Sequence, residues 1–353
     1  MQIERRAEPS RLLQFTAPLL AVAVTLLFSS LLVALAGAPV GQAYQHLLDS
    51  AFGSRFAWSE TLTRATPLML TGLAAAIAFR AKLYNIGAEG QLYAGALAAV
   101  AIGGMGDGAM STLPIPVLFT LMLLGAALAG ALLLLGPALL KSRLGVDEVV
   151  TTLLLNFIVL LFVSMMLDGP MKDPLAMGWP QSAALMSELE LSRLIPKTRL
   201  HTGLLIAVAL AIVAWVVMRF TRWGFEIRAV GLNPRGAAFA GMRVNRVMVT
   251  VALASGALAG LAGAIEVAGR TSYVTLDMSP GYGYAGIVIA MLAALNPLAV
   301  VLAAIFVAGM QVGADGMSRA VGVPNFIADV IVAAALLVML VAAMFSQYRL
   351  RRG

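Results

Sequence analysis

Cysteine is absent from the 353 residues of this chain, and charged side chains are scarce. Without cysteine there can be no disulfide framework, no cysteine-ligated zinc site and no thiol nucleophile. Only 12% of the residues are Asp, Glu, Lys or Arg, whereas an ordinary soluble domain carries about 25%. So few charges cannot cover the surface of a water-soluble fold of this length. The composition therefore argues against a soluble domain of any class.

The sequence has only two histidines and no P-loop motif for binding nucleotides. The two histidines, His46 and His201, each fall near the end of an apolar segment, where an interfacial polar residue is the simpler interpretation. No Gly-x-x-x-x-Gly-Lys-Ser/Thr motif occurs, so this chain cannot bind ATP through a P-loop. The net charge of +7 comes without a long basic tail. We expect this charge to reflect loop topology rather than nucleic-acid binding.

Apolar residues make up 61% of the chain and are grouped in ten segments. A membrane-spanning helix needs about 20 mostly apolar residues. We therefore predict an all-α, polytopic membrane protein with about ten spans, forming a single transmembrane domain over residues 1–353 with its core at 67–345. The first segment is longer than the roughly 7–15 residues of a signal-peptide core, so we expect it to be an anchor. The segments are Phe15–Gly37, Pro67–Phe79, Ile86–Met105, Pro114–Leu139, Val149–Leu167, Thr202–Met218, Val247–Ala268, Tyr284–Leu295, Leu298–Ala314 and Phe326–Phe345.

The positions of Lys and Arg predict the orientation of these segments. With the N-terminus inside, about two thirds of the lysines and arginines fall in cytoplasmic segments, and the C-terminus is cytoplasmic as well. An outer loop is predicted at 168–201, where X-Pro turn signals break any long helix. A basic inner segment is predicted at 219–246. Two apolar segments, Pro67–Phe79 and Tyr284–Leu295, are too short to span as straight helices, so they either extend into polar flanks or form half-helices.

The inner segment carries the signals of a short helix. Asn233 is a favourable N-cap, Pro234 a favourable first residue and Gly241 a favourable terminator. So short a helix is unstable alone in water, and its small residues let another surface approach closely. A coupling helix docked on a cytoplasmic partner and a plain surface helix between two spans both remain open. The candidate coupling residues are Arg228, Gly231, Asn233, Pro234, Gly236, Ala237, Ala238 and Gly241.

Polar side chains inside or beside apolar segments are candidates for a solute pathway. Asn85, Glu89 and Gln91 lie among glycines at the start of such a segment, and all three are costly when they face lipid. An intramembrane Glu is a functional hypothesis by default, and the plain alternative is an ion pair of Glu89 with Arg80 or Lys82.

The other polar positions allow simpler interpretations. Asn156 lies within an apolar segment, where an amide either joins helices or contacts a polar solute. Glu266 and Arg270 are four residues apart, so an intrahelical ion pair is expected. Tight helix packing is predicted at two Gly-x-x-x-Gly seams, Gly256/Gly260 and Gly309/Gly313. A faint echo between Tyr93-Ala-Gly95 and Tyr284-Ala-Gly286 suggests an inverted repeat.

Four motifs in order along the chain carry a resemblance to a known family. They begin with Asn85-Ile-Gly-Ala-Glu-Gly-Gln91 and continue with Gly145–Asn156, Gly169–Pro174 and Gly231–Ala238. The chain resembles the permeases of ABC importers for branched-chain amino acids, ribose and nucleosides. Within that superfamily it looks most like the larger permease of bacterial purine-nucleoside importers. It departs from the family at Leu155 and Phe157, where a Met and a Tyr are common.

The resemblance implies a translocation subunit that imports nucleosides by alternating access, with no enzyme activity and no cofactor of its own. ATP and Mg²⁺ would be bound by a cytoplasmic ABC ATPase with tandem cassettes, contacted through residues 228–241. A second, non-identical permease and an extracytoplasmic substrate-binding lipoprotein would complete the complex in the bacterial inner membrane. A same-superfamily permease for a simple sugar or amino acid remains an alternative. An ion-coupled secondary transporter is another, although it predicts a titratable pair near the bilayer midplane and the acids here lie near span ends.

Overall fold

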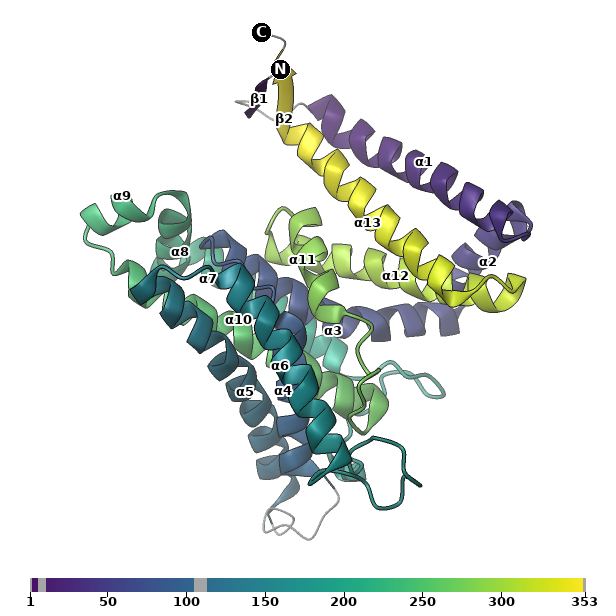
Figure 1. Cartoon of the computed structure of the whole chain (residues 1–353), viewed down its shortest axis with the longest axis horizontal. Helices are drawn as coiled ribbons and strands as arrows, with labels where there is room; N and C mark the ends of the chain where they lie inside the picture. The colour runs from purple at the N-terminus through teal and green to yellow at the C-terminus, as the bar shows by residue number, and fades with distance from the viewer. Residues whose placement is uncertain (1, 6–10, 105–112, 352–353) are drawn as a thin grey trace. The chain divides into compact units, whose positions relative to one another are not determined.

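The computed structural model describes residues 2–5, 11–104 and 113–351, and this part of the chain is almost entirely helical (Figure 1). The expected all-α class is confirmed, apart from two four-residue strands, β1 and β2, that pair antiparallel. Met105, the predicted end of one segment, lies outside the described residues. The elements are β1 Gln2–Arg5, α1 Arg11–Leu35, α2 Val40–Phe52, α3 Arg55–Arg80, α4 Ala88–Gly103, α5 Ile115–Leu144, α6 Glu148–Asp168, the 3₁₀ turn η2 Ser187–Leu189, α7 Gly203–Phe220, α8 Arg222–Leu232, α9 Pro234–Phe239, α10 Val244–Glu266, the π-helix η3 Val267–Thr271, α11 Tyr282–Leu292, α12 Pro297–Val321, α13 Asn325–Gln347 and β2 Tyr348–Arg351.

Six described helices are long and apolar enough to cross a membrane, and a seventh span results if the bent pair α1–α2 counts as one. The multi-pass architecture is therefore confirmed, and the number of ten spans stays a prediction. Pro67–Phe79 extends into its polar flank, because it is part of the longer helix α3. Tyr284–Leu295 corresponds to α11, which has only 11 residues and is too short to span alone. The six long helices are α3, α5, α6, α7, α10 with its π-helical extension, and α12.

The chain divides into two compact units, residues 1–61 with 305–353 and residues 62–304, and α3 and α12 contribute residues to both. The second unit is organised around α4, α5 and α10, which meet through glycines. A Cβ atom at Gly130 would collide with the carbonyl oxygen of Gly256, and one at Gly260 would collide with that of Ala126. A Cβ at Gly95 would likewise collide with the carbonyl of Gly260. The predicted seam at Gly256/Gly260 is thus confirmed as a close backbone contact.

In the other unit, α1 lies beside α13, and α12 packs its glycines against α2. A Cβ at Gly309 would collide with the Phe52 ring, and one at Gly313 would come within 2.6 Å of the Leu47 carbonyl oxygen. The second predicted seam is therefore also a site of close packing. Helices α1 and α2 are bent by 117° relative to one another.

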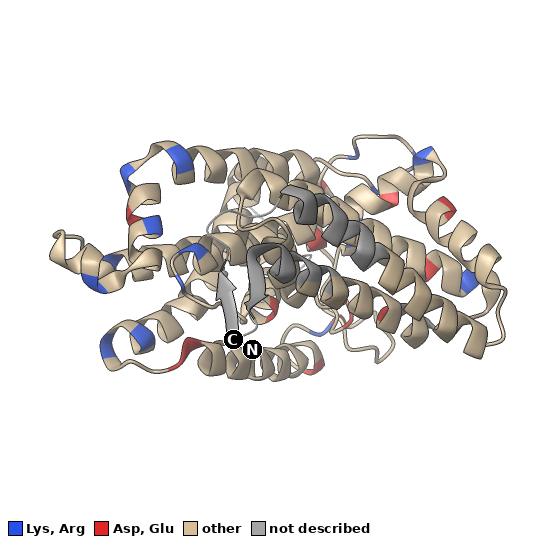
Figure 2. Ribbon diagram, turned by 90° about the horizontal axis from the view of Figure 1, so that it is seen from above, with Lys and Arg blue, Asp and Glu red and all other residues tan. Residues whose placement is uncertain are grey.

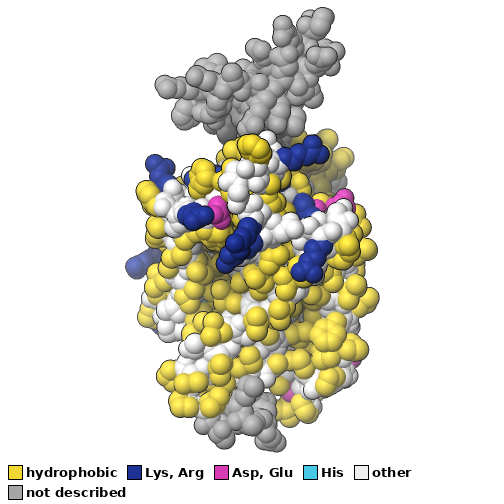
Figure 3. Space-filling view, turned by 90° about the vertical axis from the view of Figure 1, so that its left-hand side faces the viewer, with side chains coloured by type: hydrophobic (Ala, Val, Ile, Leu, Met, Phe, Trp, Pro, Cys, Tyr) yellow, Lys and Arg dark blue, Asp and Glu magenta, His cyan; other side chains and the backbone are white. Residues whose placement is uncertain are grey.

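The outer surfaces of the long helices are apolar. On α5, Leu124, Leu128 and Leu132 are four residues apart and each more than half exposed, as expected of a helix face toward lipid. Figure 3 shows hydrophobic side chains over most of one face, with Lys and Arg gathered toward one end. Many of the basic residues lie at turns between helices (Figure 2).

The predicted outer loop at 168–201 has no long helix and is held by backbone hydrogen bonds to the segment that follows α10. Leu191 N–H donates to the carbonyl of Ala268 at 2.8 Å, and Ser182 N–H donates to that of Val274 at 3.0 Å. Met186 N–H donates to Gly103 at the end of α4. This loop therefore covers the ends of α4 and α10 within the second unit.

Candidate functional site in the helical core

The turn between α3 and α4 places Asn85 and Gln91 face to face. Each amide donates to the other, with N···O distances of 2.9 Å in both directions. Asn85 also accepts from the Gly87 N–H at 3.0 Å and donates to the Ser255 hydroxyl at 3.1 Å. Ser255 in turn donates to the carbonyl of Ala74 at 2.8 Å. Because all these groups are buried, the network joins the start of α4 to α3 and α10 with its polar atoms satisfied.

Asn156 of α6 fastens the same turn from the other side. Its Oδ1 accepts from the Gly90 N–H at 2.9 Å, and its Nδ2 donates to the carbonyl of Ile86 at 2.8 Å. Nδ2 also reaches the Tyr284 hydroxyl at 3.1 Å. Asn156 is fully buried, whereas 39% of Tyr284 is exposed. The amide therefore joins α6 to α4 and α11, and Tyr284 extends this network to an accessible surface.

Glu89 lies in the first turn of α4 and is bound to the N-terminal end of α11. Its carboxylate accepts from the Gly283 N–H at 2.6 Å and from Ser279 and Gly281. The first N–H groups of a helix have no partner within the helix and attract negative charge. Glu89 thus caps α11, and the ion pair considered with Arg80 or Lys82 is replaced by this contact.

The four predicted pathway residues are therefore brought together around the start of α4, all buried and all bonded to other parts of the protein. Their contact with a solute stays a prediction. Two tyrosines of α11, Tyr282 and Tyr284, belong to the same region but were not selected from the sequence. The Tyr-Ala-Gly echo at Tyr284 was the only signal that pointed to one of them.

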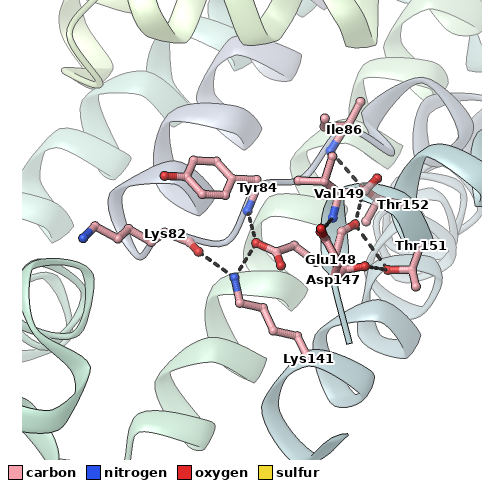
Figure 4. Close-up of polar contacts among 9 residues, drawn as sticks. All are labelled: Lys82, Tyr84, Ile86, Lys141, Asp147, Glu148, Val149, Thr151 and Thr152. Atoms are coloured by element: carbon pink, nitrogen blue, oxygen red, sulfur yellow. Dashed lines mark hydrogen bonds and ion pairs between the residues drawn. The ribbon is translucent and has the colours of Figure 1, made fainter. Parts of the chain in front are cut away.

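The α3–α4 turn, which leads into the N-terminal end of α4, is held by an ion pair between α5 and α6 (Figure 4). Lys141 Nζ pairs with the Glu148 carboxylate and donates to the carbonyl of Lys82 at 2.8 Å. Glu148 also accepts from the Tyr84 N–H at 3.1 Å. The Thr152 hydroxyl accepts from the Ile86 N–H at 3.2 Å. Residues of the motif Gly145–Asn156 thus position the backbone around the motif Asn85–Gln91.

The basic segment at 219–246 contains the short helix that the sequence predicted. The Asn233 side chain accepts from the Gly236 N–H at 3.0 Å, as an N-cap does, and α9 runs from Pro234 to Phe239. Gly241 follows with a φ of +81°, a conformation that glycine adopts at low cost. The cap and terminator are confirmed at the predicted residues.

Some of the coupling candidates are packed against the protein, and the others are exposed. Arg228 donates to the carbonyl of Met218, and a Cβ at Gly231 would collide with the carbonyl of Arg80. Helix α8 therefore packs against the end of α3, immediately before the α3–α4 turn. Ala237 is buried, while the segment exposes Leu232 by 80% and Phe239 by 98%. Pro234, Gly236 and Ala238 are exposed as well.

Glu266 and Arg270 form the expected ion pair, and Arg270 also donates to the Tyr282 hydroxyl at 2.9 Å. This pair lies in the same unit as the α4 network and was interpreted from the sequence as a local contact alone. Among the described residues, no group of three His, Cys, Asp or Glu could hold a metal ion.

Comparison with known proteins gives one matching family and several close relatives. The family described as "Branched-chain amino acid transport system / permease component" matches residues 57–343. The guanosine ABC transporter permease protein NupP of Bacillus subtilis is 35% identical over 339 residues, covering 95% of this chain and 95% of the relative. The glucose ABC transporter permease protein TsgB13 of Haloferax volcanii is 37% identical over 373 residues, covering 100% and 96%. The nucleoside ABC transporter permease protein NupB of Lactococcus lactis is 31% identical over 327 residues, covering 90% and 88%.

Proposed function

Because the chain belongs to the family of permease components of branched-chain amino acid transport systems, we propose that it is the larger permease of an ATP-driven nucleoside importer. As an ABC permease it is a transmembrane subunit without a catalytic domain, and it binds no cofactor itself. The observation that carries the nucleoside assignment is its full-length similarity to permeases named for guanosine and for nucleosides.

Glucose is the second candidate, because the permease named for glucose is similarly close and matches the whole chain. A free amino acid fits less well. Its carboxylate would need a cationic or helix-terminal partner, and both groups described above, Arg270 and the N-terminal end of α11, are already bound to Glu266 and Glu89.

The proposal assigns ATP hydrolysis to a cytoplasmic ABC ATPase, with tandem cassettes, that docks on α8 and α9. Two observations support this docking site. The segment exposes two large apolar side chains, Leu232 and Phe239, beside small residues. Its buried face packs on Arg80 at the end of α3, five residues before Asn85. Movement of α8 can therefore reach the α4 network through a few packed contacts, which is what alternating access requires.

The complete assembly that we propose contains a second, non-identical permease and an extracytoplasmic substrate-binding lipoprotein in a bacterial inner membrane. Both termini and residues 219–246 are assigned to the cytoplasm, and residues 168–201 to the outer side, because of the distribution of Lys and Arg. About ten spans with an inverted repeat, forming one domain, remain part of this proposal. In this proposal the short helix α11 corresponds to the half-helices of other transporters.

The deciding experiment is uptake by the whole complex in cells, with labelled guanosine and labelled glucose compared. We expect guanosine uptake that stops when the ATPase partner loses its catalytic residue and that continues when the proton gradient is collapsed while ATP is maintained. Uptake of glucose alone would replace the substrate assignment. Uptake that follows the proton gradient and ignores the ATPase would refute the importer assignment itself.

The absence of native cysteine makes the orientation testable with single cysteines. A cysteine at Ser187 should react with an impermeant thiol reagent in intact cells, whereas cysteines at Ser142 and Arg235 should react only after permeabilisation. Labelling of position 235 from outside would overturn the assigned orientation.

A further inference from the structure

Glu266 is fully buried at the end of α10, and only one of its two carboxylate oxygens is satisfied. Oε1 pairs with Arg270. Within the described part of the chain, Oε2 has no hydrogen-bond partner. A buried acceptor left without a donor is costly, and in native proteins such groups are rare. The unpaired Oε2 therefore needs an explanation, and binding of a ligand is one.

The backbone around this carboxylate is irregular. Helix α10 continues as the π-helix Val267–Thr271, closed by the bond from the Ser272 N–H to the Val267 carbonyl at 2.9 Å. Single π turns occur frequently at functional sites. The following residues, 273–281, form no regular helix before α11 begins.

This irregular segment reaches deep into the unit. The Tyr93 hydroxyl donates to the carbonyl of Leu276 and accepts from the Ser279 N–H. Tyr93 lies ten residues from Gly103, where the outer loop closes over α4, so the contact is about 15 Å along the helix from that end. Non-helical backbone at such a depth is tolerated where it is buried in protein or lines a water-filled cavity.

Arg270 connects the carboxylate to an accessible surface. It contacts Glu266 and the Tyr282 hydroxyl, and 25% of its side chain is exposed. The charges of the pair cancel, which leaves Glu266 Oε2 as an acceptor beside the guanidinium of Arg270. Such a pair suits an uncharged solute with hydroxyl and N–H groups. An anion would have to compete with Glu266 for Arg270.

We propose that Glu266, Arg270 and Tyr282 form a contact site for an uncharged polyhydroxylated solute on the outer half of the pathway. Glu266 Oε2 accepts a hydrogen bond from a solute hydroxyl, and Arg270 leaves Tyr282 to donate to a solute oxygen. This inference rests on the proposed import function and adds the residues that recognise the solute. An intramembrane charged pair beside irregular backbone, here the π-helix and residues 273–281, is a common location for such contacts in transporters.

The first test is Glu266→Gln in the complete transport complex, assayed with whichever solute the wild type imports. We expect KM to rise about tenfold or more, because a hydrogen bond to a charged group contributes about 1.5–3 kcal/mol. The Glu266→Gln variant should import an analogue that lacks the bonded hydroxyl as well as it imports the natural solute. Glu188→Gln, at an exposed position of the outer loop, is the matched control and should keep the wild-type KM.

The second test separates recognition from a purely structural ion pair. The exchanged pair Glu266→Arg with Arg270→Glu preserves the ion pair but moves the acceptor to another place. We expect the exchanged pair to assemble as the wild type does and to show the same raised KM as Glu266→Gln. Wild-type KM and wild-type discrimination in the exchanged pair, or in Glu266→Gln, would overturn the proposal.

A labelling experiment gives an answer even if these variants fail to assemble. A single cysteine at Thr271, beside Arg270 in the π-helix, should react more slowly with a small thiol reagent when solute is present. Equal reaction rates with and without a saturating concentration of the imported solute would contradict the proposed site. Failure of the wild type to import any solute would instead count against the proposed function.

Discussion

The carboxylate of Glu89 accepts a hydrogen bond from the backbone N–H of Gly283, 194 residues further along the chain. Gly283 packs so closely that a Cβ there would collide with the Glu89 backbone. The first turn of α4 and the first turn of α11 are thereby fixed against one another. A negative group at the positive end of a helix stabilises it, and here that group comes from a different helix.

The first prediction concerns this contact. Glu89→Ala should lower the free energy of unfolding by about 1–3 kcal/mol, because it leaves buried N–H groups of α11 without an acceptor. Glu89→Gln should cost less, since its amide oxygen can still accept. Thermal unfolding of the purified complex in detergent measures both. A variant pair with wild-type unfolding temperatures but an altered KM would instead place Glu89 in contact with solute.

The second prediction tests the glycine seam between α5 and α10. Gly130→Ala should prevent normal packing, because its Cβ would collide with the backbone carbonyl of Gly256, and backbone cannot move aside as a flexible side chain can. Overpacking of this kind costs about 1–3 kcal/mol or more. Among the described residues, no atom outside the backbone of the same helix lies within 4 Å of a Cβ added at Gly136, so Gly136→Ala should be tolerated or mildly stabilising. Equal expression and unfolding temperature for the two variants would contradict a close seam.

These examples show which features the sequence could predict. The cap at Asn233, the Glu266–Arg270 pair and the glycine seam are local patterns, and the structure confirms each of them. Gly283, a partner of Glu89, lies 194 residues away, and the partners of Asn156 lie 66, 70 and 128 residues away. No spacing rule links such positions, so the sequence could identify the polar residues but not what they bind.

The start of α3 illustrates a second limit. The apolar run suggested a segment from Pro67, but α3 begins at Arg55 and continues through Pro67. Ser59 and Thr63 in its first half are buried by the protein. Hydropathy measures the cost of facing lipid, so it cannot recognise a polar helix face that is covered by neighbouring helices.

The third prediction concerns pH. Burial lowers the pKa of His201, at the end of the loop 168–201, from 6.5 to about 4. The folded protein therefore favours the neutral imidazole, and the resulting stability is complete above about pH 6.5 and falls as the pH drops toward 4. At about 1.4 kcal/mol per pH unit, the loss approaches 3 kcal/mol. It is measured as the difference between the unfolding temperatures of the wild type and His201→Asn from pH 7.5 to 4.

The control for this measurement is His46→Gln, which removes the other histidine of the chain. Its side chain is exposed, so this variant should keep the wild-type dependence on pH. A parallel dependence in the wild type and in His201→Asn would show that His201 does not contribute to acid sensitivity.

The last prediction concerns the exposed face of α9. Ala238→Trp should uncouple transport while the protein still inserts and folds. Ala238 is exposed, and substitutions at free surface positions usually change stability by less than about 0.5 kcal/mol. If an ATPase docks on this face, the same bulky ring must be accommodated in a fitted interface, which costs about 1–3 kcal/mol. Phe239→Ala tests the opposite change, because it removes an apolar side chain that is 98% exposed and would anchor the partner.

The measurement is co-purification of the ATPase with each variant, together with solute uptake. Both variants should lose ATPase and uptake to a similar degree, since one blocks the interface and the other removes its anchor. Met177→Trp, at a fully exposed position of the outer loop, should retain the ATPase, because the assigned orientation puts it on the other side of the membrane. Gly236→Leu provides a further check, since the three atoms nearest to its new Cβ all belong to the exposed Asn233 side chain. Normal assembly and uptake in Ala238→Trp, Gly236→Leu and Phe239→Ala together would mean that α9 is a surface helix and that the ATPase docks elsewhere.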